Sequence, residues 1–484
     1  MNHQFTLPTL IRAISKQEIE QNLSGLLEKV CPLLVAIVAG FAQGEITPIE
    51  THSFECRMEE AVRKLGLTVL QYAYSSLETE EIESMPGSIK HWDKSYRRIS
   101  AKSIHASILT RFGNIELTRA TYRRGRSGKM IAPLEKSLGI ERGFTPAAMD
   151  FVGQQVAATG ASQSRAINVI AERTGTRIGA EKLRKATSFL AESMEVHRQA
   201  CQLRQLQRWI DQANGNGKNT VLSISRDGVS ICIAPMGYFE MASVATLSVY
   251  SEGNCIGTVY IAASPQENQT ILSDKLTSLL KDVIRSHVDN LTRIVYVTDG
   301  GANETSYWKN VLSKFFVDGN RIRIDRTLDY YHASLRLTTI ADCLKLTSKN
   351  RGEWLESTRK LLLEEGGLGR VMRSISRMKS IHGLKRGKSK DFLTAEKYLR
   401  RHRRFMNYWE QRERLCPIGS GIVESACKQI VSERMKLSGM RWKYEGMQQI
   451  MTLRSILLSQ TWASTFKQVL LSNSPVDNQY ASAA

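Results

Sequence analysis

The sequence lacks the features that mark a metal-stapled, secreted or membrane-spanning protein. Its eight cysteines are scattered, without a Cys-x-x-Cys pair or a short Cys/His cluster, so neither a zinc site nor a disulfide framework is predicted. We expect them to be reduced thiols of a cytoplasmic protein. The longest apolar run, 30–42, is interrupted by Pro32 and is shorter than the roughly 20 residues of a membrane span. The first fifteen residues show no signal-peptide pattern.

Acidic residues are scarce relative to basic ones. The chain of 484 residues has 67 Lys and Arg against 47 Asp and Glu, a formal charge of +20. An excess this large favours a polyanionic partner, with nucleic acid as the first candidate and no membrane partner expected. Apolar residues at 42% and charged residues at 24% are typical of a globular protein. The length predicts about two to four domains.

The beginning of the chain is predicted to be helical and to lead into a strand pair. Residues 1–90 have a helical pattern, which is clearest over 54–77. Two strands, 107–112 and 115–122, flank Gly113-Asn114, which is a two-residue hairpin signal.

Three short helices separated by glycine turns are predicted next, at 146–159, 162–173 and 179–194. Short helices with a basic last member resemble a helix-turn-helix, although three small helices are also an ordinary packing unit. We therefore assign 91–200 as a DNA-binding region. The basic residues assigned to DNA in it are Arg123, Arg124, Arg126, Lys129, Arg177, Lys182 and Arg184.

The pattern changes at residue 214 to three strands, a helix, a strand, a helix and a strand. The predicted elements are 220–233, 242–250, 256–263, 269–288, 293–297, 306–316 and 321–326. This order predicts an α/β fold with a mixed sheet covered by helices over 214–335. The rest divides into a helical segment at 336–412, a segment at 413–471 and a polar tail at 472–484.

Three carboxylates are candidates for one site. Asp227 and Asp299 each precede a glycine at or near the end of a hydrophobic strand, where the backbone can turn away while the carboxylate projects into a crevice. Glu424 lies at the start of a predicted helix capped by Ser420. Three such carboxylates can hold two divalent metals about 4 Å apart, and oxygen ligands suit Mg²⁺, with Mn²⁺ as a substitute. The alternatives are two turn aspartates and a glutamate that complements the helix dipole.

Three stretches carry a resemblance to DDE transposases of bacterial insertion sequences, in particular the ISKra type. They are 299–302 (DGGA), 328–333 (LDYYHA) and 417–428 (PIGSGIVESACK) continuing to 438–442 (SGMRW). The pair Asp329 and His332 resembles the D-x-x-H signature of Mutator-like and hAT-like enzymes. The resemblance covers roughly 100–465. It implies a ribonuclease-H-like catalytic core over 214–335 and 413–471, split by a helical insertion at 336–412.

The resemblance implies an enzyme that cuts DNA at the element's terminal repeats and joins the freed 3′ ends to target DNA. Asp227, Asp299 and Glu424 match the metal-binding triad, and Asp329 with His332 matches the accessory signature. Whether Asp299 or Asp329 is the second metal ligand stays open, although the hydrophobic strand before Asp299 favours it. No organic cofactor is expected. Assembly as a homo-oligomer on DNA, associated with the nucleoid in the cytoplasm, is expected as well.

The chain departs from the family pattern at two places. Arg226 stands before the first aspartate, where an apolar residue is more usual. The basic segment 123–129 stands where relatives often carry a cysteine pair.

Several further residues have two interpretations each. His332 could position a metal ligand or a phosphate, or be a packed residue at a helix start. Lys428 could reach a phosphate or form an i,i+4 ion pair with Glu424. Trp442 could stack on a base, although core packing between Met440 and Tyr444 is favoured.

Two basic clusters in 336–412 are expected to contact phosphates, with a solvated helix face as the alternative. Their residues are Lys385, Arg386, Lys388, Arg400, Arg401, Arg403 and Arg404. Two other functions are considered: a ribonuclease-H-like nuclease without strand transfer, and a catalytically silent DNA-binding protein derived from a transposase.

Overall fold

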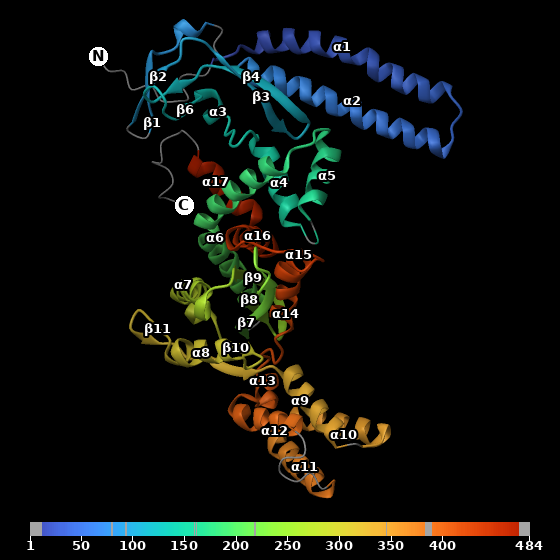
Figure 1. The fold of residues 1–484 in the computed structure, drawn as a ribbon, viewed down its shortest axis with the longest axis vertical. Helices are drawn as coiled ribbons and strands as arrows, with labels where there is room; N and C mark the ends of the chain where they lie inside the picture. The colour runs from blue at the N-terminus through green and yellow to red at the C-terminus, as the bar shows by residue number, and fades with distance from the viewer. Residues whose placement is uncertain are drawn as a thin grey trace. The chain divides into compact units, whose positions relative to one another are not determined.

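The chain forms two compact units, which are described separately. The computed structural model describes residues 12–78, 81–91, 94–158, 160, 162–216, 219–344, 346–382 and 390–473. One unit consists of Met1–Met194 with Phe466–Ala484, and the other of Glu195–Thr465. Figure 1 shows the order of the elements along the chain.

The first unit begins with a hairpin of two long helices, α1 (Lys16–Gln43) and α2 (Pro48–Ser75). Ser15 and Thr47 cap them, since each side-chain oxygen accepts a hydrogen bond from a backbone N–H three residues on. Among the described helices, α1 is the one that by length and composition could cross a membrane, and none of its apolar stretch is buried. A core helix of a soluble protein can have the same composition, so this is weak evidence.

Two antiparallel sheets follow the hairpin in the first unit. Four strands pair in the order β1-β2-β5-β6, and a second sheet is a hairpin of two strands. The strands are β1 (Ser88–His91), β2 (Lys94–Arg98), β3 (Ser103–Thr110), β4 (Gly113–Arg119), β5 (Tyr122–Arg123) and β6 (Met130–Ile131). The strand pair predicted near 107–122 is therefore present.

The turn of the β3–β4 hairpin lies two residues before the predicted one. Thr110 pairs with Gly113, so Arg111 and Phe112 form the turn, and Asn114 lies within a strand. Thr110 explains the shift, because its hydroxyl donates to the Gly113 carbonyl (2.8 Å) and accepts from Phe112 N–H (3.0 Å).

Helices make up the rest of the first unit. They are α3 (Pro133–Ser137), α4 (Pro146–Ala157), α5 (Gln163–Thr174), the first part of α6 (Ala180–Asn216) and the end of α17 (Trp462–Asn473). The three predicted short helices are α4, α5 and α6, but α6 does not end at 194. It continues to Asn216 because apolar positions recur along it until Ala213 and no glycine interrupts it before Gly215.

The second unit contains a mixed five-stranded sheet in the order β13-β10-β7-β8-β9. The strands are β7 (Thr220–Cys232), β8 (Phe239–Ser251), β9 (Asn254–Ala263), β10 (Arg293–Thr298) and β13 (Asp325–Leu328). β8 is antiparallel to β7 and β9, whereas β7, β10 and β13 are parallel to one another. This confirms the mixed sheet. The strand predicted at 321–326 begins later, at Asp325, after a small ribbon of β11 (Phe316–Val317) and β12 (Asn320–Arg321).

The two faces of this sheet carry different clusters. Leu222 and Ile224 point into a large core that α6 and α7 (Thr270–His287) complete, while α8 (Ala302–Asn310) contributes Tyr307. The alternate residue Val221 joins Val295, Val297 and further residues on the other face, which Cys416 and Ile422 cover.

A helical segment with its own core follows β13, as predicted. It comprises α9 (Tyr330–Cys343), α10 (Ser348–Leu362), α11 (Gly367–Ile381), α12 (Lys390–His402) and α13 (Tyr408–Glu413). The chain then enters α14 (Gly421–Ala426), a π-helical turn at Cys427–Ser432, α15 (Glu433–Met435) and α16 (Tyr444–Leu458). Short 3-10 turns lie at Ile82–Ser84, Glu267–Gln269, Val288–Asn290, Leu312–Lys314 and Arg403–Phe405.

The packing of α6 on β9 depends on Gly257. A Cβ at this position would lie 2.2 Å from the ring of Trp209, which is buried. We expect Gly257→Ala to lower the free energy of unfolding by about 1–3 kcal/mol through overpacking. Gly352, exposed within α10 with open space around its Cα, is the matched control, and Gly352→Ala should raise it by about 0.5–1 kcal/mol. Urea unfolding followed by circular dichroism measures both; equal shifts would contradict the prediction.

Candidate functional site

Asp227 lies inside a strand rather than at its end. β7 runs on to Cys232, with Asp227 opposite Val244 and Gly228 opposite Ser243 in unbroken register. The strand predicted at 220–233 is confirmed, whereas the expectation that the backbone turns away after Asp227 is wrong. Gly228 instead leaves room for the Met241 side chain of β8, because a Cβ there would lie 2.5 Å from the Met241 sulfur. The Gly228 N–H donates to Asp227 Oδ1 at 2.7 Å.

Asp299 follows the last residue of β10, as predicted. Gly300 turns the chain with φ +82°, a value that favours glycine. The Gly301 N–H then donates to Asp299 Oδ1 at 2.9 Å. The Tyr398 hydroxyl, from α12, donates to the Asp299 carbonyl at 2.5 Å.

The register of the parallel strands brings the aspartates together. Ile224 pairs with Tyr296, so positions 227 and 299, each three residues further on, lie abreast on the same face. Thr298 pairs with Leu328, so Asp329 is in turn abreast of Asp299. Their shared face is the one that carries Val295 and Val297.

Glu424 comes to this face from α14. Burial raises the pKa of Asp227, and the charges of Asp299 and Glu424 raise it further, against the bond from Gly228 that lowers it. The Cys427 thiol lies beside Asp227; burial raises its pKa, and the Asp227 charge raises it further. Asp227 therefore lies near enough to Asp299 and Glu424 for the charges of both to act on it.

Asp329 is held by the protein itself. It is completely buried. Its Oδ1 accepts from His332 N–H at 2.7 Å, and its Oδ2 accepts from both the N–H and the hydroxyl of Ser420, the latter at 2.7 Å. Since each oxygen is already bonded and none is exposed, Asp329 serves as a clamp between α9 and α14. Asp299, in contrast, is partly exposed.

His332 orients Glu424, because its Nε2 lies 3.1 Å from Glu424 Oε1. Ser420 does not make the predicted side-chain cap of its helix. Its hydroxyl lies 3.2 Å from the same Glu424 oxygen, but its single proton is donated to the nearer Asp329 carboxylate. The D-x-x-H pair therefore reaches Glu424 through the His332 ring.

A fourth carboxylate, Glu304, was missed in the sequence. It lies in the first turn of α8 and is only 7% exposed. Its Oε2 and Asp299 Oδ1 lie 2.3 Å and 3.3 Å from the point that a Cβ on Gly301 would occupy. Burial raises the pKa of Glu304, and the Asp299 charge raises it further. The sequence did offer one signal for Glu304, because it is an acidic residue in the first helical turn directly after Asp299-Gly300-Gly301.

The carboxylate oxygens of this site suit a hard divalent cation, but the described side chains are not arranged as a complete set of metal ligands. Carboxylate oxygens are the ligands that Mg²⁺ takes. In the part of the chain that the structure describes, no three His, Cys, Asp or Glu side chains are arranged to hold a metal ion. Glu424 is engaged by His332 instead.

Three neighbouring residues have contacts that bear on their interpretations. Lys428 is exposed and, within the described chain, forms no ion pair with Glu424. Trp442 is packed: its Nε1 donates to the Met435 carbonyl at 3.2 Å, and the Arg434 guanidinium lies over its ring. Arg226 is 2% exposed and donates to Ser273 and to the buried Gln269, so the unusual arginine is buried with hydrogen-bond partners.

The basic residues assigned to DNA differ in availability. Lys182 is engaged, because its Nζ donates to the Ser107 carbonyl at 2.8 Å and lies over the Phe144 ring. Arg177 donates to Asn168 at 3.1 Å and, like Arg184, is exposed. The helix-turn-helix interpretation of this region stays a prediction.

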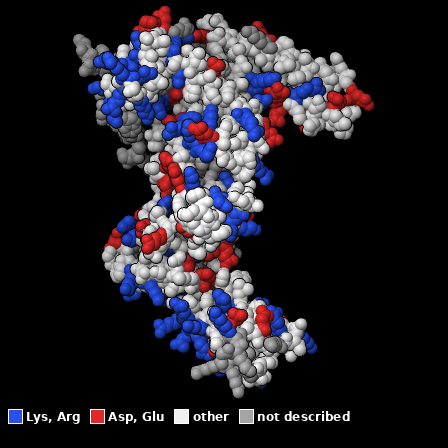
Figure 2. Space-filling model, viewed as in Figure 1, with Lys and Arg blue, Asp and Glu red and all other residues white. Residues whose placement is uncertain are grey.

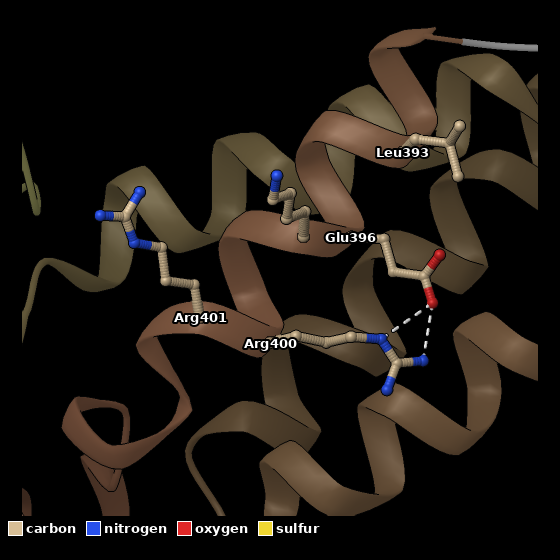
Figure 3. Close-up of a pocket in the computed structure, with 5 residues that line it drawn as sticks. Leu393, Glu396, Arg400 and Arg401 are labelled. Carbon is tan, nitrogen blue, oxygen red and sulfur yellow. Dashed lines mark hydrogen bonds and ion pairs between the residues drawn. The ribbon is translucent and has the colours of Figure 1, made fainter.

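The basic cluster on α12 is partly neutralised. Arg400 pairs with Glu396, which Lys379 also contacts, whereas the Arg401 side chain points away from Glu396 (Figure 3). Arg403 and Arg404 are exposed. Lys385, Arg386 and Lys388 lie outside the described residues.

No protein-family model matches this chain, and none of the curated proteins is significantly similar to it. The site therefore rests on its own geometry.

The Asp329 clamp is testable by substitution. Asp329→Asn replaces an acceptor that faces two Ser420 donors or the His332 N–H, so it should lower the free energy of unfolding by about 2 kcal/mol. Asp342→Asn on the same helix, an exposed partner of Arg351, should change it by less than about 0.5 kcal/mol. Chemical unfolding measures both. Equal small effects would contradict the clamp.

The raised pKa of Asp227 predicts a pH-dependent stability in metal-free protein. Because its pKa is higher folded than unfolded, ionisation opposes folding; the cost is present above the folded pKa and disappears below the ordinary value of 3.8. In EDTA, Asp227→Asn should be more stable than wild type at pH 7, and the difference should vanish as the pH falls towards 3.8. Exposed Asp289→Asn is the control. Thermal unfolding across pH measures this, and a less stable Asp227→Asn at pH 7 would refute it.

Proposed function

We propose that this protein is a DDE transposase that cuts DNA at insertion-sequence ends and joins them to target DNA. The observation that carries the proposal is the placement of Asp227 and Asp299 abreast on neighbouring parallel strands, with Glu424 brought to the same face. The sheet order, with β8 antiparallel in an otherwise parallel core β13-β10-β7, supports a ribonuclease-H-like fold. The helical segment between β13 and α14 stands where that family has its insertion.

Asp227, Asp299 and Glu424 would hold two divalent cations, Mg²⁺ or Mn²⁺. When bound, these cations supply charge stabilisation and an activated water for in-line displacement at a phosphodiester. The sheet fixes the two aspartates, whereas Glu424 depends on its helix. The bonds from Ser420 to Asp329 fix the start of α14, and His332 sets the direction of the Glu424 carboxylate. His332 and Asp329 are thus positioning residues.

The formal charge of +20 supports a DNA partner. Element ends and target DNA would be bound as a homo-oligomer, associated with the nucleoid in the cytoplasm. Exposed Arg177 and Arg184 are proposed to contact the terminal repeats. The proposed reaction needs no organic cofactor.

One observation favours a second candidate, a catalytically silent DNA-binding protein. Glu424 pairs with His332, and no complete set of metal ligands exists in the described part of the chain. All three carboxylates are nevertheless retained, which favours the enzyme.

The decisive experiment is Mg²⁺-dependent cleavage of DNA carrying the element's flanking ends. We expect Asp227→Asn, Asp299→Asn and Glu424→Gln to lose cleavage but keep DNA binding, because each removes a charged ligand without altering the exposed basic residues. Asp289→Asn, a change of an exposed carboxylate, should cleave like wild type.

Three outcomes would change the proposal. Unchanged cleavage by Glu424→Gln would return Glu424 to a helix-dipole role. Cleavage without joining of the 3′ ends would favour a nuclease. DNA binding without cleavage by any form would favour the silent DNA-binding protein.

A further inference from the structure

The four-stranded sheet of the first unit has one buried face and one basic face. Side chains alternate along each strand, so Ile89 and Tyr96, which pair across β1 and β2, point into a core with Tyr122 and Ile131. The residues between them point outward. Lys90, Arg97 and Arg123 occupy these outward positions on β1, β2 and β5.

Two of these arginines face each other directly. Arg97 and Arg123 are partners in the β2–β5 register and lie on the same outward face. Like charges directly opposite each other destabilise a sheet. Neither makes an ion pair with any described residue; Arg123 donates only to the Arg126 carbonyl (3.3 Å) and the Met130 sulfur (3.4 Å). The described residues of the four strands include no acidic side chain to offset the repulsion.

The loop from β5 to β6 extends this charge. Arg124, Arg126 and Lys129 are all exposed. The positive charge also acts on His91 of β1. Burial lowers the pKa of His91, and the charges of Lys136 and Lys129 lower it further. In Figure 2, Lys and Arg side chains gather over the region of β1, β2 and β6.

We propose that this outward face, formed by Lys90, Arg97, Arg123, Arg124, Arg126 and Lys129, binds the phosphodiester backbone of duplex DNA without reading its sequence. The charges are spread over three strands and a loop, which fits an extended polyanion better than a small anion. Side chains projecting from strands contact phosphates and position a protein, while base edges carry the sequence information. The repulsion between Arg97 and Arg123 is then relieved by the bound phosphates.

The inference rests on the proposed function only in naming DNA as the partner. An anionic membrane surface is the alternative, since the same unit contains the apolar exposed helix α1. The DNA backbone is favoured because the basic face consists of paired strands whose outward side chains are polar or charged, apart from Met130.

The test is the salt dependence of duplex binding by the full chain. Arg97→Thr with Arg123→Thr removes two facing charges at strand positions that suit threonine. On both element-end and unrelated duplexes, the slope of log affinity against log salt should fall by about 1 for each phosphate that the variant no longer neutralises. The unfolding temperature should stay equal or rise, because a repulsive pair is removed. If the two arginines instead stabilised the sheet, their replacement would lower the unfolding temperature.

The matched control is Arg57→Gln with Lys64→Gln on α2, which removes the same two charges from exposed ion pairs. It should leave the slope unchanged. If the slope fell equally in both double variants, the proposal would be overturned, because DNA binding would then depend on the net charge of the protein rather than on this face. Loss of binding to vesicles containing anionic lipid, with DNA binding intact, would overturn it in favour of a membrane. Neither readout needs cleavage, so a failure of the proposed enzymatic function is distinguishable from a failure here.

Discussion

The parallel pairing of β7 with β10 is the constraint on which the candidate site depends. Because Ile224 pairs with Tyr296, Asp227 and Asp299 lie at the same level of the sheet and on the same face. A slip of one residue would send one carboxylate to the opposite face, where α6 and α7 pack against Leu222 and Ile224. The long antiparallel pairing of β7 with β8 runs through Asp227 without a bulge, and so fixes that register further.

The second constraint joins segments far apart in the sequence. Asp329 and Ser420 are 91 positions apart, yet the carboxylate of one accepts both donors of the other. The Tyr330 N–H also donates to the Ile418 carbonyl at 2.9 Å, so α9 and the segment before α14 are tied by backbone as well. The helices α9 to α13, which lie between them in the sequence, pack around a separate core. These bonds hold the start of α14 beside α9, although the helical segment between them is long.

Each unit contains one local cluster of like charges. In the second unit, burial raises the pKa of Asp227 and of Glu304, and the charge of Asp299 raises both further, a cost that a bound cation would reduce. In the first, arginines face each other on an exposed sheet, a cost that a polyanion would remove. Both are local conflicts of charge that folding alone does not favour. Such conflicts are expected where a protein binds something.

The sequence by itself predicted the element order of the second unit, its mixed sheet, the helical segment after β13 and the candidacy of Asp227, Asp299 and Glu424, because hydrophobic periodicity and residues at strand ends or helix starts are local signals. It did not predict β1, β2 and β6, and β1 begins within the stretch 1–90 that was predicted to be helical. The predicted turn of the β3–β4 hairpin was wrong because the Thr110 hydroxyl bonds within an earlier turn. The predicted end of α6 was wrong because apolar positions continue along the helix beyond residue 194. Asp299 and Asp329 look alike in sequence. Only the tertiary structure separates them, since burial and the donors of Ser420 come from a segment remote in the chain. The same holds for Glu304 and for the facing arginines, because strand register and burial are decided by packing between distant residues.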